Sequence, residues 1–64
     1  MEKYYFELEY SDGSSVDWYV EIEGSWGKFG ATLMMICRGT LMASNAKRCT
    51  CYNSEGFDVC SYIQ

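Results

Sequence analysis

Two segments near the start of the chain alternate between apolar and polar residues, and this alternation constrains the fold more than any other feature. In residues 4–10 the even positions are aromatic or aliphatic, and residues 16–23 repeat the pattern. The residues between them, 11–15, are Ser-Asp-Gly-Ser-Ser, which are turn formers. A period of two is typical of a half-buried strand, so the pattern predicts a β-hairpin. With Tyr10 placed opposite Val16, the even residues form an apolar face and the odd residues form an acidic outer face.

The period changes after Gly24. Residues 26–44 carry apolar side chains at helical spacing, which predicts a helix lying on the sheet, with Ser25 as its N-cap. The predicted buried side of the helix comprises Trp26, Phe29, Leu33, Cys37, Thr40 and Leu41. Three glycines in this segment each lower helix stability by roughly 1 kcal/mol relative to alanine, so a later start near Gly30 stays open. A buried strand over residues 32–37 is the alternative interpretation.

The last third of the chain predicts a second hairpin. Residues 47–52 and 57–63 are rich in strand-forming side chains and flank the turn sequence Asn-Ser-Glu-Gly at 53–56. The order ββαββ predicts an α+β fold, a single domain over residues 1–64, in which one helix packs on one face of a four-stranded antiparallel sheet. The expected core comprises Phe6, Leu8, Trp18, Val20, Ile22, Phe29, Leu33, Cys37 and Leu41.

Size and composition exclude several classes of function. A chain of 64 residues leaves little volume for both a core and an enclosed active site, and it has no histidine to act as a general base or metal ligand. We therefore expect neither an enzyme nor a bound cofactor. The net charge of -4 and the pI near 4.4 also argue against direct binding of DNA or RNA, because phosphates would be repelled.

No targeting or membrane segment is expected from the sequence. Residues 1–10 have neither a basic start nor an apolar run, and the longest apolar stretch, residues 30–37, is far short of the ~20 residues of a membrane-spanning helix. These features predict a cytoplasmic protein. In that reducing compartment we expect the four cysteines to be thiols.

The cysteines allow three interpretations. A four-thiolate zinc site is disfavoured, because only one residue separates Cys49 from Cys51, whereas structural zinc sites favour Cys-x-x-Cys pairs. A second interpretation is that Cys49 or Cys51 lies across from Cys60 and forms a disulfide with it after air oxidation. Small buried or half-buried thiols are the favoured interpretation, and no histidine is present to activate them as nucleophiles.

Charge is distributed unevenly along the chain. Residues 1–24 hold seven acids and one base, a net charge of -6, whereas residues 25–64 have a net charge of +2. In the predicted register Glu9 lies opposite Asp17, an arrangement that costs stability. This acidic hairpin, with tyrosines among its acids, predicts either a solubilising surface or a recognition surface for a basic partner protein. The candidate partner-binding residues are Tyr5, Glu7, Glu9, Asp12, Asp17, Tyr19, Glu21 and Glu23.

The predicted helix offers a second contact patch on the side away from the sheet. There Ala31, Met35 and Met42 lie near Arg38 and Lys28, and exposed methionines adapt readily to partners. The alternative hypothesis is therefore a small acidic interaction or assembly module that binds through this methionine patch. In either case we expect a monomer or a weak homodimer.

In size, acidity and organisation, the chain resembles the small phage-encoded anti-CRISPR proteins. The resemblance rests on the tyrosine-containing acidic hairpin and the single helix, and those proteins share no common motif. It implies an inhibitor in a host bacterial cytoplasm that occupies the basic nucleic-acid channel of a CRISPR effector complex. Carboxylates on a rigid sheet would stand in for DNA phosphates there and block target DNA.

Overall fold

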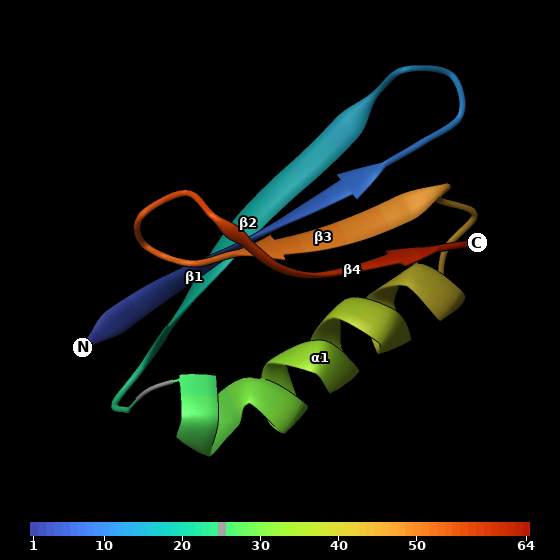
Figure 1. The fold of residues 1–64 in the computed structure, drawn as a ribbon. Helices are drawn as coiled ribbons and strands as arrows, with labels where there is room; N and C mark the ends of the chain where they lie inside the picture. Colours follow the sequence, from blue (N-terminus) through green and yellow to red (C-terminus); the bar gives the residue numbers. More distant parts are fainter. Residues whose placement is uncertain (25) are drawn as a thin grey trace.

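The computed structural model describes residues 1–24 and 26–64, which form four strands and one helix in the predicted order ββαββ (Figure 1). The elements are β1 (Glu2–Glu9), β2 (Ser15–Ile22), α1 (Trp26–Met42), β3 (Arg48–Tyr52) and β4 (Asp58–Ile63). The strands make one antiparallel sheet in the order β2-β1-β3-β4. The predicted fold class is confirmed.

Both hairpins close through the same kind of three-residue loop. In the first, the Tyr10 amide donates to the Ser14 carbonyl (2.9 Å), and the Gly13 amide donates to the Tyr10 carbonyl (3.1 Å). Gly13 has a φ of 92°, a left-handed conformation that residues with a Cβ adopt at a cost. The turn between β3 and β4 repeats this geometry, with Gly56 (φ 88°) in the equivalent position.

This loop shifts the register of the first hairpin by two residues from the prediction. Tyr10 bonds to Ser14 rather than facing Val16, and the strand pairs that follow place Glu7 opposite Asp17. The predicted pairing of Glu9 with Asp17 is therefore wrong, because a loop of three residues rather than five connects the strands. The division of side chains between the two faces is unaffected, since a shift of two leaves every side chain on its predicted side.

Helix α1 begins at Trp26, not near Gly30, and ends two residues before the predicted end. The alternative of a buried strand over residues 32–37 is wrong, and the predicted N-cap, Ser25, lies outside the described residues. Gly30 has a packing role that its helix propensity does not reveal. A Cβ there would lie 3.0 Å from the Trp26 indole, so the glycine leaves room for that ring to approach Tyr4, with ring centroids 6.2 Å apart.

The core lies between α1 and the two central strands. Its buried apolar side chains are Tyr4, Phe6, Leu8, Leu33, Cys37, Leu41, Ala46, Cys49 and Cys51. Five of these belong to the predicted core, whereas Tyr4, Ala46 and the two β3 cysteines do not. The burial of both cysteines agrees with the favoured interpretation of the thiols. Helix α1 packs mainly against β3 and β4, and Figure 1 shows the β1–β2 hairpin extending beyond the helix.

Four residues of the predicted core are only half-buried, three of them because of this offset. Trp18, Val20 and Ile22 lie on β2, at the edge of the sheet away from the helix, although Trp18 still stacks on Phe6 with ring centroids 5.3 Å apart. Phe29 contacts the chain before the helix instead of the core, and a Cβ at position 24 would overlap its ring. Among the described residues, we find no helix with the length and apolar character needed to cross a membrane.

Candidate functional site

The outer face of the sheet, defined as the side opposite α1, carries most of the candidate partner-binding residues. Strand pairing arranges these side chains in rows that cross the strands. One row contains Asp17, Glu7 and Thr50, and the next contains Tyr19, Tyr5 and Tyr52. The sheet therefore joins a pair of acids to a line of three tyrosines.

Glu7 and Asp17 are the most closely opposed acids of the face. Because the Tyr10 amide bonds to Ser14, the hydrogen-bonded pairs of this ladder are the even-numbered ones. The Glu7–Asp17 pair is thus a non-hydrogen-bonded pair, the kind in which opposed side chains come closest. Like charges directly opposite each other destabilise a sheet, so this pair works against folding.

A hydroxyl on β3 offsets part of the Glu7 charge. The Tyr52 hydroxyl donates to Glu7 Oε1 at 3.4 Å, a long hydrogen bond. Burial of the ring, followed by the nearby Glu7 carboxylate, raises the pKa of Tyr52. The phenol therefore stays protonated and able to donate at neutral pH. Asp17 is exposed and lies on the far side of Glu7 from this donor.

The tyrosine row is accessible on the hairpin. Tyr5 is 41% exposed and Tyr19 is 54% exposed, and their ring centroids lie 6.0 Å apart. Lys3 stands opposite Glu21 in the register, and its ammonium lies 5.0 Å from the Tyr19 ring centroid. Glu21 consequently has a base beside it, unlike Asp17.

Glu9 is also compensated. Arg48 is its partner on β3, and Arg48 Nε lies 3.6 Å from Glu9 Oε2. That separation makes an ion pair rather than a hydrogen bond, and the Nε atom has no hydrogen-bond partner among the residues described. Both side chains are about two-fifths exposed, so water screens the pair and its contribution to stability is small.

Two of the predicted site residues lie apart from this face. Asp12 is in the first turn, where its Oδ1 accepts hydrogen bonds from the amide (2.9 Å) and the hydroxyl (2.6 Å) of Ser14. The hydroxyl bond first, and the amide bond second, lower the pKa of Asp12. Glu23 is exposed and lies one residue beyond the end of β2 at Ile22, so the predicted strand over residues 16–23 ends one residue early. The ladder stops there because the chain turns at Gly24 toward α1.

The four cysteines are free thiols at the contact of α1, which carries Cys37, with β3 and β4, which carry the other three. Cys37 donates to the Cys49 carbonyl at 3.2 Å, and Cys51 faces Cys60 across the β3–β4 ladder. Burial raises the pKa of all four thiols, that of Cys51 to about 12, so they are poor nucleophiles at neutral pH. Among residues 1–24 and 26–64, no group of three or more potential ligand side chains is arranged to hold a metal ion.

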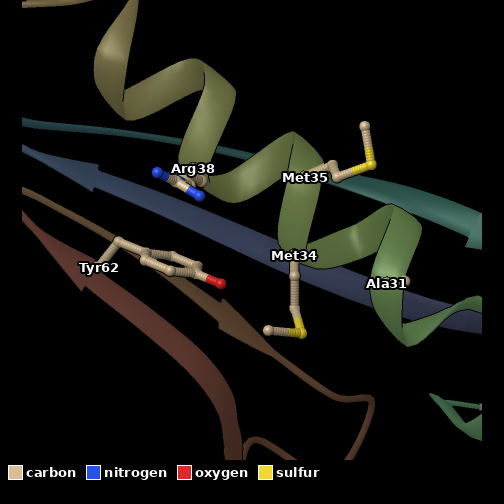
Figure 2. Close-up of a pocket in the computed structure, with 5 residues that line it drawn as sticks. All are labelled: Ala31, Met34, Met35, Arg38 and Tyr62. Carbon is tan, nitrogen blue, oxygen red and sulfur yellow. The ribbon is translucent and has the colours of Figure 1, made fainter.

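The methionine patch of the helix borders a small pocket. Figure 2 shows Met34 and Tyr62 pointing into the space between α1 and β4, while Met35 points away. Arg38 and Ala31 complete the lining, and the volume is about 250 Å³. Met34 is itself exposed. This volume is below the ~300–1,000 Å³ typical of small-molecule sites, so the pocket suits a side chain better than a ligand.

Comparisons of this chain with known protein families, with curated proteins and with solved structures give no match. Two residues that shape the outer face were missed by sequence reasoning. Tyr52 and Arg48 reach it because β3 pairs with β1, which residue alternation alone does not reveal. Lys3 was expected on this face, since it alternates in phase with the acids of β1, but it was not counted among the candidate partner-binding residues.

Proposed function

We propose that the protein is an inhibitor that binds a basic nucleic-acid-binding surface of a partner protein through the outer face of β1 and β2. It acts as a DNA mimic and competes with the partner's own nucleic acid. The resemblance to phage anti-CRISPR proteins makes a CRISPR effector complex the partner class to test. The proposal includes neither catalysis nor direct binding of nucleic acid by this chain.

The observation that carries the proposal is the opposition of Glu7 and Asp17. This pair costs stability in the free protein, while the neighbouring Glu9 and Glu21 have bases beside them. A cationic side chain of a partner placed between Glu7 and Asp17 would relieve their repulsion and form new ion pairs. Binding would therefore remove a repulsion that destabilises the free protein.

The tyrosine row supports the same face as an interaction surface. Tyr5 and Tyr19 lie directly beside the acidic pair and expose large rings with a polar tip. Tyrosine and arginine are enriched in protein interfaces, and an arginine that reaches the acids would lie close enough to stack on these rings. A rigid sheet holds acids and rings in fixed positions, which lowers the entropic cost of binding.

The test measures inhibition of target-DNA binding by type I and type II effector complexes. The variant Glu7→Gln with Asp17→Asn removes the acidic pair and keeps both shapes. Each close charge pair with a partner base is worth ~1.5 kcal/mol or more, so the double variant should inhibit roughly 100-fold more weakly.

The matched control is Glu55→Gln with Asp58→Asn, which makes the same change in net charge on exposed residues of the other hairpin. It should inhibit within about threefold of the unmodified protein if only long-range charge is altered. Equal losses for both double variants would show that net charge, not the acidic pair, drives binding. No inhibition of any effector by the unmodified protein would refute the proposed partner class.

The exposed methionines favour a second candidate, an interaction or assembly module that uses the helix. Met35 is 74% exposed and Met42 is 66% exposed, so both offer apolar, adaptable side chains to a partner. The variant Met35→Gln with Met42→Gln keeps the side-chain length and helix propensity. If partner binding fails with this variant and survives loss of the acidic pair, the helix is the interaction surface.

A further inference from the structure

Strand β2 leaves one long edge of the sheet open. It is the terminal strand in the order β2-β1-β3-β4, and its eight residues pair with β1 without interruption, from Glu2↔Ile22 to Glu9↔Ser15. The opposite edge, β4, is shorter, and the β3–β4 register shifts between Cys51 and Tyr52. Bulges, prolines and charged side chains, above all lysines, are the usual protection of edge strands; β2 has no bulge, proline or lysine, and its charged side chains are Asp17 and Glu21.

The register identifies which backbone groups face this open edge. Even-numbered residues of β2 exchange hydrogen bonds with β1, as the bond from the Tyr10 amide to Ser14 sets the alternation. The N–H and C=O groups of Asp17, Tyr19 and Glu21 therefore point away from β1. They form a row of donors and acceptors spaced for an added strand.

An apolar strip runs beside the same edge on the helix side of the sheet. Val16 is 53% exposed, and Trp18, Val20 and Ile22 are only half-buried because α1 packs against β3 and β4 instead. An added strand would lay alternate side chains against this strip. Its backbone would gain hydrogen bonds and its apolar side chains would be buried at the same time.

We propose that the β2 edge binds an extended segment of a partner protein in which apolar side chains alternate with lysine or arginine, adding a fifth strand to the sheet. The apolar residues of that segment would pack beside Trp18 and Val20. Its basic residues would project on the outer face next to Asp17 and Glu21, the charged residues of β2, both of which are acidic.

Charge distinguishes this occupant from a second copy of the chain. Pairing β2 with β2 of another molecule would bring a further Asp17 and Glu21 onto the same outer face, already next to Glu7. Adjacent strands would then present like charges to one another, which is unfavourable. A basic segment removes this repulsion and also matches the apolar strip.

This inference does not rest on DNA mimicry. It requires the open backbone edge and the apolar strip, and it would hold for a basic partner that binds no nucleic acid. Loss of the Glu7–Asp17 pair tests the mimicry, whereas removal of backbone donors tests the edge. The two proposals can therefore fail separately.

The experiment uses the full chain and a nine-residue synthetic peptide of alternating valine and lysine, labelled for fluorescence anisotropy. A peptide of the same composition with its valines and lysines in separate blocks is the first control. A third peptide carries N-methyl groups on the alternate residues that would donate to β2, which removes those donors without changing the protein. We expect both control peptides to bind at least about tenfold more weakly than the alternating peptide.

Hydrogen exchange locates the binding site. Addition of the alternating peptide should slow exchange of the Tyr19 and Glu21 amides by about tenfold or more and leave the outer residues of β4 unchanged. The variant Tyr19→Pro removes one outward donor, which an edge strand tolerates, and Tyr19→Thr removes the same ring but keeps the donor. The proline variant should lose peptide binding while the threonine variant retains it.

Two outcomes overturn the proposal whatever the fate of the proline variant. Equal binding of the N-methylated peptide would show that backbone pairing is not involved. Protection of the Tyr19 amide in the protein alone, accompanied by a dimer in sedimentation, would make a second copy the occupant instead.

Discussion

Replacing Asp17 by asparagine should stabilise the protein. Asp17 and Glu7 form a non-hydrogen-bonded cross-strand pair, and the change removes one of the two like charges while keeping the side-chain shape. Directly opposed cross-strand pairs contribute about 0.2–1 kcal/mol in either direction. Coulomb's law for unit charges ~5 Å apart in a water-like dielectric gives ~0.8 kcal/mol, within the same range.

That free energy corresponds to a measurable shift in melting temperature. A domain of this size gains roughly 4–8 °C per kcal/mol, so Asp17→Asn should raise the midpoint by about 1–8 °C. Thermal unfolding is followed by circular dichroism at low and high salt. The gain should be largest near 10 mM salt and nearly absent near 1 M, because the screening length falls from about 30 to about 3 Å.

Glu21→Gln is the control, since Glu21 faces Lys3 instead of an acid. The same loss of one negative charge should leave stability unchanged or lower it slightly. If both variants gain stability equally, the effect comes from net charge. If Asp17→Asn gains nothing at low salt, the acidic pair is not strained and the argument for the proposed function loses its main support.

Three further outcomes follow from the packing. Gly39→Ala should raise the free energy of unfolding by about 1 kcal/mol, because alanine favours the helix and the added Cβ would meet no atom of another element within 4 Å. Gly30→Ala should gain less or lose stability, because its Cβ would lie 3.0 Å from the Trp26 indole; urea unfolding compares the two variants. Trp18→Ala should cost about 2–3 kcal/mol, below the value for a fully buried tryptophan, since the ring is half-buried and stacks on Phe6; a larger loss would place it in the core proper. Cys51 should react with iodoacetamide at pH 9 at least 100-fold more slowly in the folded protein than in denaturant. Because its pKa is about 12 when folded and near 9 when unfolded, its contribution to stability should be complete below pH 9 and decline between pH 9 and 12, as urea midpoints would show.

The strands and their faces could be predicted because alternation at Tyr4–Tyr10 and Val16–Ile22 specifies both at once. The register could not, since it depends on the loop, and Asp12-Gly13 closes a three-residue turn with Gly13 in the left-handed conformation. A glycine after aspartate is also typical of a two-residue loop, which would pair Ser11 with Ser14, so the turn sequence alone does not set the register.

Hydrophobic periodicity could not predict where the helix lies on the sheet. The pattern of α1 shows which side is apolar but not which strands that side covers, and the order β2-β1-β3-β4 follows from long-range pairing. As a result, Cys49 and Cys51 are buried in the core, whereas Trp18 is only half-buried at its edge. The same pairing decided the candidate site, because Tyr52 and Arg48 act on Glu7 and Glu9 from a strand distant in sequence.

The central β1–β3 ladder also has a kinetic consequence. Each hairpin pairs neighbouring strands and should close within about 1–10 μs, but the β1–β3 pairs join residues from Glu9↔Arg48 to Tyr5↔Tyr52 across the whole helix. The entropy of closing that long segment falls on a single step, the pairing of β1 with β3. Stopped-flow folding of Leu8→Ala and Cys49→Ala should therefore give φ-values well above that of Val59→Ala on β4, and the central seam would set the folding rate of the chain.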